Sequence, residues 1–424
     1  MFMSKKVALV AGSRIPFTKS FSHYQENTGQ ELMTAALKDL VEKTNLKGKK
    51  IDDVALGAVM MHGSDWNISR ECSLGSGLSP LTPAYDIRRA CGTSLETVIA
   101  IANKIKLGQA RVGIAGGFDT NSDAPIEFKR SFAKKLIELN KSKTALKKIS
   151  SLLSFKTKDL KPQFPGVVEP RTGKSMGQHC ELMAKEWKIS REDQDQLAFE
   201  SHQKASKAYD EGFYDDLVCE FNGVKKDSIV RPGTTIEKLS TLRPAFDKSS
   251  EGTLTAGNST ALTDGASCVL LADEDYAKEN NLPILAYFVD AQVAAFDFVK
   301  GEGLLMAPTM AVAELLKRNK LTFDDFDFFE IHEAFAAQAL STFKAWEDED
   351  YCKNRLGLDK ALGSIPREKL NIKGGSLAVG HPFGGTGARI SASLSKILNE
   401  SGKGRGLISI CTGGGMGVAA IFEK

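Results

Sequence analysis

Short apolar runs alternate with helical periodicities along the first part of the chain, and this alternation limits the possible folds more than any other feature. Apolar runs at 7–12, 54–59 and 111–117 predict buried strands. Apolar residues spaced by three and four predict a helix over 29–43 and another that starts after Cys91 and ends at Gly108. Strand–helix–strand order of this kind is typical of a mostly parallel sheet with helices on its faces.

The C-terminal part follows the same plan. A predicted strand at 326–331 ends at His332, a predicted helix runs from the glycines of 384–387 to about 398, and a strand at 407–410 leads to Cys411. In both parts a reactive residue precedes a helix, and glycines end that helix before the next strand. We therefore expect two similar α/β halves related by duplication.

The region between the halves reads as an insertion that contains a basic segment and a helix over 192–211. We expect three domains: an N-terminal half at 1–121, completed by about 256–274, an inserted loop domain at 122–255, and a C-terminal half at 275–424.

Composition excludes several classes of protein. The 424 residues are 42% hydrophobic, which is enough for a large core, but no apolar run is long enough for a membrane span. The first ten residues lack the features of a signal or transit peptide, so we expect a cytoplasmic protein. The seven scattered cysteines show no metal-ligand spacing, which predicts free thiols and no metal site. Net charge is only +3, and we expect no nucleic-acid partner.

Cys91 lies just before a predicted helix, in the sequence Arg89-Ala90-Cys91-Gly92-Thr93-Ser94. A helix N-terminus favours the thiolate because its free N–H groups and its dipole attract negative charge. We expect Thr93 and Ser94 to add hydroxyl donors, and Gly92 to leave room for a substrate. The alternative is a small buried residue at a helix end, and this motif alone does not decide between the two.

His381 and Cys411 also lie in glycine-rich settings. Glycine at 380, 384, 385 and 387 costs backbone entropy around His381, which packing alone does not explain, so a base that meets a ligand is favoured. Cys411 ends an apolar strand before Gly413-Gly414-Gly415, whose N–H groups can donate to an oxyanion. Alone, Cys411 reads as a core residue at a strand end. Together, two thiols and a base are the parts needed to move an acyl group between sulfur and carbon.

His332 follows the strand at 326–331, and we expect it to donate a hydrogen bond to a carbonyl oxygen. The sequence His332-Glu333-Ala334 is not a zinc motif, because Ala336 stands where a second histidine is required. The chain has no Walker loop, and no dinucleotide-binding glycine motif follows its first strand. Kinase and dehydrogenase chemistry are therefore not favoured.

In combination these motifs resemble the thiolase family along nearly the whole chain. The shared segments are 13–17, the Cys91 motif, 116–117, 176–177, 242–246, 255–260, and the His332, His381 and Cys411 motifs. The resemblance implies a duplicated α/β fold of two five-stranded mixed sheets covered by helices, plus an inserted loop domain. It also implies a homodimer or a dimer of dimers.

The resemblance assigns a role to each reactive residue. Cys91 is the nucleophile that takes the acyl group, and His381 is its base. Cys411 is the acid/base that protonates the departing acetyl-CoA enolate. The N–H groups of Cys91 and Gly413 hold the thioester oxyanion, whereas His332 and His381 serve the site where enolate charge develops.

Coenzyme A (CoA) is a substrate in this reading, and no cofactor is expected. The positions that the resemblance places near CoA are Met176, Phe246, Ala256 and Thr260. The basic residues that would bind the CoA phosphates cannot be identified from the motifs.

His332 distinguishes branches of the family, because many thiolases carry asparagine there. The His-Glu-Ala-Phe form is similar to the β-subunit of the fatty-acid oxidation trifunctional enzyme and its bacterial counterparts. We therefore favour thiolysis of 3-ketoacyl-CoA in fatty-acid β-oxidation. The alternatives are an acetoacetyl-CoA-forming biosynthetic thiolase and a non-catalytic acyl-CoA-binding or scaffold subunit. A decarboxylating ketoacyl synthase is disfavoured because that class lacks a second active cysteine.

The inserted segment 128–161 contains eleven basic and two acidic residues. The likeness to trifunctional enzymes implies a helical insertion here and a complex with an enoyl-CoA hydratase/3-hydroxyacyl-CoA dehydrogenase subunit. Two interpretations of the segment's apolar residues stay open. They form a surface that contacts anionic membrane, or they belong to a solvated helical hairpin that attracts the CoA phosphates or docks a partner. The apolar residues concerned are Leu136, Leu139, Ile149, Leu152 and Leu153.

Overall fold

A computed structural model describes residues 5–424. Residues 1–4, which begin the N-terminal stretch assessed above for a targeting signal, lie outside the described residues. Within 5–424, no helix combines the length and the apolar character that crossing a bilayer requires.

The first half of the sheet contains the three strands expected at 7–12, 54–59 and 111–117, together with a short edge strand and a long return strand. Their order in space is β4-β3-β5-β6-β1. They comprise β1 (Val7–Arg14), β3 (Asp53–Leu56), β4 (Ala84–Asp86), β5 (Val112–Asp119) and β6 (Thr263–Asp273). A two-residue strand, β2 (Thr18–Lys19), pairs with β6. Because β6 lies between β5 and β1, 256–274 belongs beside the first half, although the domain boundaries themselves stay a prediction.

The second half continues the sheet through a short antiparallel ladder between β1 and β7, in which Val7 pairs with Phe288. Four strands follow in the order β7-β10-β9-β8. They are β7 (Ala286–Ala295), β8 (Phe328–Ile331), β9 (Arg405–Thr412) and β10 (Met416–Glu423). An isolated bridge between Phe329 and Leu370 stands where a fifth strand would lie. The expected mixed-sheet fold is therefore confirmed, with a reduced outer strand in this half.

The prediction of a mostly parallel sheet is wrong. Among the named strands of the described residues, only β3 with β4, β3 with β5, and β8 with β9 pair in parallel. The centre is antiparallel because β9 and β10 form a tight hairpin and because β6 returns only after the long insertion. A tight hairpin joins antiparallel neighbours. The strand–helix alternation that predicted a parallel sheet comes from the outer strands, and it does not report on the pairing at the centre.

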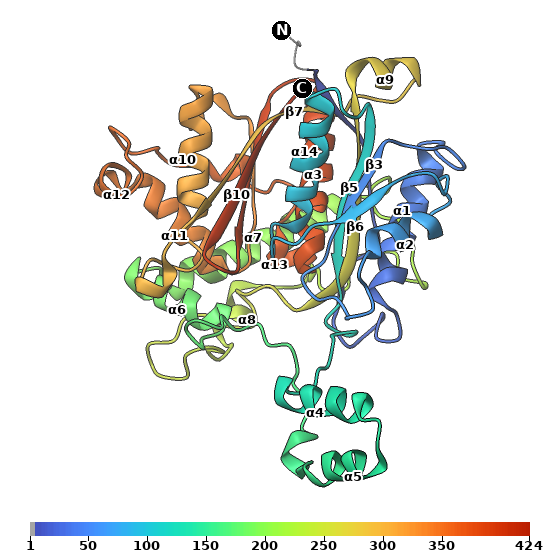
Figure 1. Cartoon of the computed structure of the whole chain (residues 1–424). Helices are drawn as coiled ribbons and strands as arrows, with labels where there is room; N and C mark the ends of the chain where they lie inside the picture. The colour runs from blue at the N-terminus through green and yellow to red at the C-terminus, as the bar shows by residue number, and fades with distance from the viewer. Residues whose placement is uncertain (1–4) are drawn as a thin grey trace.

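Two helices lie back to back in the middle of the molecule, and other helices cover the outer faces of the sheet (Figure 1). The central pair is α3 (Thr93–Lys106) and α14 (Thr386–Ser401), both close to their expected positions. On one side lie α1 (Gly29–Lys43) and α2 (Ile68–Gly75), and near β1 lies α9 (Glu274–Glu279). On the other side lie α10 (Pro308–Asn319), α11 (Ala336–Glu347) and α12 (Glu349–Asn354). Among the described residues, this layering buries three large apolar clusters and a small fourth one of Ala205, Ala378 and Val379.

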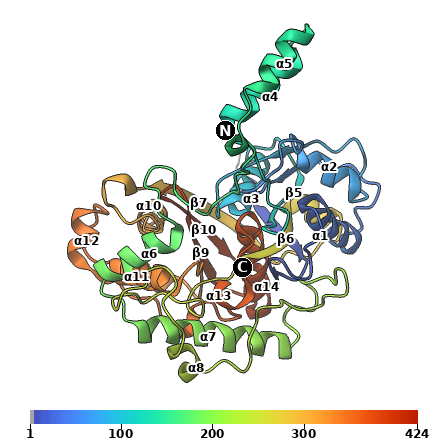
Figure 2. The ribbon, with the colours of Figure 1, turned by 90° about the horizontal axis from the view of Figure 1, so that it is seen from below.

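The insertion forms two separate structures. Its second part covers one end of the sheet with α6 (Met176–Glu186), α7 (Arg191–Asp210) and α8 (Ile236–Ser240), and Figure 2 shows α7 running across both halves. Its first part is a helical hairpin, α4 (Arg130–Lys141) and α5 (Ala145–Leu153), which projects away from the body (Figures 1 and 2). Ser190 caps α7, because its hydroxyl oxygen accepts a hydrogen bond from Asp193 N–H.

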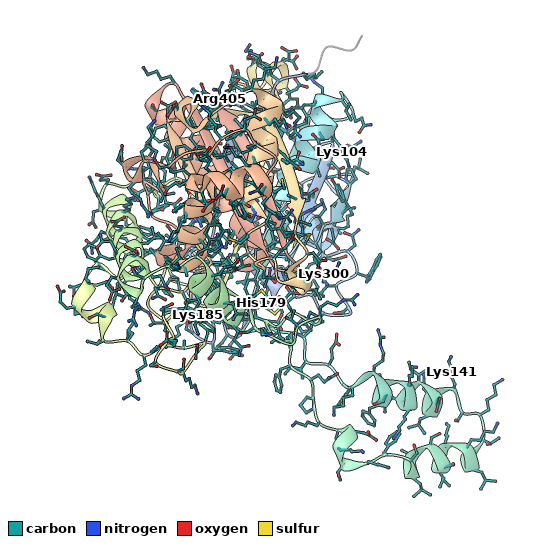
Figure 3. The ribbon with its side chains drawn as sticks, turned by 90° about the vertical axis from the view of Figure 1, so that its left-hand side faces the viewer. Lys104, Lys141, His179, Lys185, Lys300 and Arg405 are labelled. Carbon is teal, nitrogen blue, oxygen red and sulfur yellow. The ribbon has the colours of Figure 1, made fainter. Side chains whose placement is uncertain are left out.

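The projecting hairpin has a small aromatic core of its own. Phe132 is buried and its ring lies 5.3 Å from that of Phe128 and 5.0 Å from that of Phe155. No residue of α5 is buried. Figure 3 shows the hairpin standing clear of the body, with Lys141 on α4.

Candidate active site

Cys91 occupies a sharp bend between β4 and α3. Ala90 before it has a left-handed backbone, with φ +43°, and Gly92 after it is the N-cap of α3. A Cβ atom at Gly92 would lie 2.8 Å from Val418 Cγ2 on β10. The expectation that Gly92 leaves room for a substrate is therefore wrong: this glycine permits close packing on the sheet, and the packing fixes the bend that presents Cys91.

The Cys91 thiol is not activated in the resting protein. Burial raises its pKa to about 12, against a lowering by the backbone N–H groups of Gly413 and of Cys91 itself, with Asp119 adding to the rise. Thr93 and Ser94 do not assist it: the Thr93 hydroxyl donates to Ala90 O, and Ser94 Oγ accepts from Ala388 N–H. The expected low pKa is therefore wrong, because desolvation outweighs the effect of the helix end.

Cys411 and Gly413 lie at the hairpin between β9 and β10. Gly414 and Gly415 have φ of +79° and +71°, which makes this a tight glycine turn. The turn places the Gly413 N–H against the Cys91 sulfur. The Cys411 thiol is 1% exposed, and burial together with the neighbouring thiols of Cys91 and Cys180 holds its pKa well above the usual range.

A carboxylate from the insertion holds the same turn. Glu169, which the sequence interpretation missed, accepts a 2.6 Å hydrogen bond from Gly414 N–H. It is 8% exposed, and its charge contributes to the raised pKa of Cys91. No motif marks this residue, because it reaches the turn from 245 positions away in the sequence.

The two histidines form a tilted pair, with ring centroids 4.1 Å apart and ring planes at 49°. His332 directly follows β8, and His381 lies between α13 (Ser376–Val379) and α14. The Nδ1 atom of His332 lies 2.9 Å from Ser376 Oγ, and that of His381 lies 2.5 Å from Thr386 Oγ1. Within the described residues, both Nε2 atoms are buried and have no hydrogen-bond partner. Two neighbouring ring nitrogens that lack a protein partner can form hydrogen bonds to an oxygen atom of a ligand.

Both imidazoles are neutral at physiological pH. Burial, reinforced by the Arg389 cation, lowers the pKa of His381 to about 3. Burial, the neighbouring His381 and Arg389 lower the pKa of His332 well below its usual value. A neutral ring can accept a proton from a thiol or donate a hydrogen bond to an oxyanion. The pair can therefore supply both a base and a hydrogen-bond donor.

These residues converge at one end of the sheet. His332 N–H donates to Ser409 O, which is two residues before Cys411 on β9. The first turns of α3 and α14 are joined by the 2.9 Å hydrogen bond from Ala388 N–H to Ser94 Oγ. Asp119 at the end of β5 accepts from Gly384 N–H, which anchors the His381 loop beside the first half. The chain thus gathers reactive groups from both halves.

Of the four positions expected near CoA, Met176 and Thr260 contact residues of this centre. The Met176 sulfur would contact a Cβ built on Gly413, at 3.8 Å. The Phe246 ring lies 5.7 Å from that of Phe335. Thr260 donates through Oγ1 to Ser376 O at 2.8 Å, whereas Ala256 is exposed. Their contact with CoA stays a prediction.

Comparison with known proteins identifies the family. Residues 7–275 match the thiolase N-terminal domain, and residues 282–424 match the thiolase C-terminal domain. The chain is 38% identical over 424 residues to a 3-ketoacyl-CoA thiolase of Photorhabdus laumondii, covering 99% of this chain and 97% of that protein. It is 39% identical over 425 residues to a 3-ketoacyl-CoA thiolase of Colwellia psychrerythraea, with the same coverage.

Two solved structures have the same fold as this chain. A human mitochondrial 3-ketoacyl-CoA thiolase in complex with CoA superposes with a TM-score of 0.82 at 29% identity, over 100% of this chain and 99% of that one. An acetyl-CoA acetyltransferase of Bacillus anthracis superposes with a TM-score of 0.83 at 29% identity, over 99% of both chains.

Proposed function

This chain belongs to the thiolase family, and from that premise we propose that it cleaves 3-ketoacyl-CoA with CoA, giving acetyl-CoA and a shortened acyl-CoA. The observation that carries the proposal is the placement of two neighbouring thiols, Cys91 and Cys411, beside a pair of neutral histidines. Covalent catalysis at Cys91 divides a difficult carbon–carbon cleavage into two easier steps.

In the first step the Cys91 sulfur attacks the 3-keto carbon while His381 takes the thiol proton. The oxyanion is held by the N–H groups of Cys91 and Gly413, which already point at the sulfur. The bond between C2 and C3 then breaks, and the enolate oxygen of the departing acetyl-CoA receives hydrogen bonds from His332 and His381. Cys411 protonates the enolate carbon and becomes a thiolate.

In the second step a CoA thiol gives its proton to the Cys411 thiolate and attacks the acyl group on Cys91. The same oxyanion site stabilises the tetrahedral intermediate. When the carbon–sulfur bond to Cys91 breaks, the His381 imidazolium returns its proton to the Cys91 sulfur. All three groups are then restored, which is consistent with neutral thiols and histidines in the resting protein.

A thiolysis assay tests this function against its alternatives. We expect CoA-dependent cleavage of 3-ketoacyl-CoA substrates across C4 to C16, with turnover on chains longer than C4. Cleavage of the C4 substrate alone would favour an acetoacetyl-CoA-forming enzyme. Binding of acyl-CoA without cleavage at any length would favour the scaffold subunit and would contradict the proposal.

We propose that the protein works in the cytoplasm as a homodimer or a dimer of dimers. The likeness to trifunctional enzymes supports association with an enoyl-CoA hydratase/3-hydroxyacyl-CoA dehydrogenase chain. Co-purification of that chain with this one separates a complex from a free oligomer.

We propose further that the α4–α5 hairpin contacts anionic membrane. The apolar side chains that face solvent include Leu146 and Leu153, which are 82% and 81% exposed, and they stand among lysines. Ile149 and Leu152 are also exposed, whereas Leu136 and Leu139 are half-buried within the hairpin and so offer less apolar surface to solvent. A basic amphipathic surface binds anionic lipid by charge and by apolar insertion together.

Vesicle binding tests the hairpin. Leu146→Ser with Leu153→Ser should weaken sedimentation with anionic phospholipid vesicles by at least about tenfold, because two large apolar groups no longer insert. Leu81→Ser with Leu107→Ser is the matched control, since these leucines are 74% and 70% exposed on the body. Equal binding by both double variants would contradict the proposal.

A further inference from the structure

Two polar side chains behind His332 form a chain of hydrogen bonds that the reaction scheme does not use. Arg389 Nη2 on α14 donates to Ser376 Oγ at 2.7 Å, and Ser376 Oγ lies 2.9 Å from His332 Nδ1. Arg389 is 2% exposed and Ser376 is fully buried. Neither residue carries a sequence signal for this role.

The direction of the second hydrogen bond follows from the first. A guanidinium can only donate, so Ser376 Oγ accepts from Arg389 and keeps its own hydrogen. Within the described residues, His332 Nδ1 is the acceptor that lies within reach of that hydrogen. The hydroxyl therefore donates to Nδ1, and the single proton of the neutral imidazole resides on Nε2. That atom is the one that is buried without a protein partner.

We propose that Ser376 and Arg389 are positioning residues that hold His332 as the Nε2–H tautomer, so that it presents a donor to the enolate oxygen. The inference rests on the proposed function. An asparagine amide at this place would offer a donor without assistance, whereas histidine offers one only in the correct tautomer. A histidine at this position therefore needs a partner that selects between its ring nitrogens.

His381 requires the opposite arrangement. To take a proton from Cys91, its Nε2 must carry a lone pair, so its Nδ1–H donates to Thr386 Oγ1. Two neighbouring rings thus hold opposite tautomers, a donor in His332 and an acceptor in His381. With centroids 4.1 Å apart, two imidazolium cations would repel each other, which favours one proton transfer at a time.

The ionisable groups around Arg389 are buried, and burial raises the pKa of Glu330 to about 8. Arg389 Nη1 lies 4.0 Å from Glu330 Oε2, and the Glu333 carboxylate beside it receives hydrogen bonds from Ser201 and Asn371. Removal of Arg389 would take away the cation that opposes the rise in the pKa of Glu330, and it would leave buried polar groups without a partner, which would threaten folding. Ser376 is therefore the residue to change.

The test measures the tautomer directly. In protein with 15N-labelled histidine, wild type should show the His332 proton on Nε2, and a His332→Asn variant assigns the signal among the six histidines. Ser376→Ala should produce a tautomer mixture or the Nδ1–H form and should lower the thiolysis rate about tenfold, the value of one well-formed hydrogen bond. Ser376→Thr, which keeps the hydroxyl, should restore both properties.

Ser391→Ala is the matched control, because Ser391 is also buried but its hydroxyl donates to Gly387 O on its own helix. It should leave the tautomer and the rate unchanged. A wild-type His332 proton on Nδ1, or an unchanged tautomer in Ser376→Ala, would overturn the inference. Failure of wild type to cleave any 3-ketoacyl-CoA would instead contradict the proposed function, and the spectrum distinguishes the two results.

Discussion

Replacement of Cys91 by serine should reduce thiolysis by at least about a thousandfold, because the acyl acceptor is lost. A serine hydroxyl is far harder to deprotonate than a thiol, and His381 is a weak base whose pKa is lowered to about 3. The two oxyanion N–H groups remain in place, so binding of substrate should change little. Steady-state thiolysis and mass spectrometry of protein mixed with acyl-CoA measure the two consequences, a lost rate and a lost covalent adduct.

Cys219→Ser provides the matched control. Cys219 is partly exposed, like Cys91, but its thiol contacts Arg14 O, far from the site. This variant should keep the wild-type rate and the adduct on Cys91. Full activity in Cys91→Ser would refute the assignment of the nucleophile, and an adduct on another cysteine would identify its replacement.

Much of the fold was predictable because the decisive signals are local. Helical spacing in 29–43 gives α1 with the same limits, and the helices after Cys91 and around 386–398 appear as α3 and α14. The antiparallel centre was not predictable, since pairing of β5 with β6 joins strands separated by the whole insertion. Local patterns specify which segments are strands, whereas the direction of their partners depends on how the intervening chain returns.

The reactive residues could also be identified from sequence, but not the state of their side chains. Glycine settings marked Cys91, His381 and Cys411, and the structure brings them to one end of the sheet. The helix end beside Cys91 predicted a lowered pKa, whereas burial raises it to about 12. Burial depends on how the two halves pack together, so the residues next to Cys91 in the sequence do not indicate it. Glu169, Ser376 and Arg389 were missed for the same reason.

Replacement of Cys411 by alanine should stop carbon–carbon cleavage while Cys91 still accepts an acyl group. Without the second thiol, the acetyl-CoA enolate has no proton donor and the incoming CoA thiol has no base, so thiolysis should fall at least about a hundredfold. Transfer of an acyl group from acyl-CoA to Cys91 reverses the second step, so the loss of Cys411 should slow it. The transfer forms no enolate, however, and the departing CoA thiolate can take the proton that His381 received from Cys91. Mass spectrometry should therefore detect acyl-Cys91 when this variant is mixed with acyl-CoA, although the variant no longer cleaves 3-ketoacyl-CoA.

Cys180→Ala separates this effect from damage to packing. Cys180 lies on α6 in the same buried cluster as Cys411, so both variants remove one sulfur from the same core. The two should lose similar stability, of about 1 kcal/mol in thermal unfolding, because similar cavities form. Only Cys411→Ala should lose thiolysis. Equal activity in the two variants would show that the second thiol fills space and moves no proton, and the catalytic role would pass to a neighbouring group such as His381.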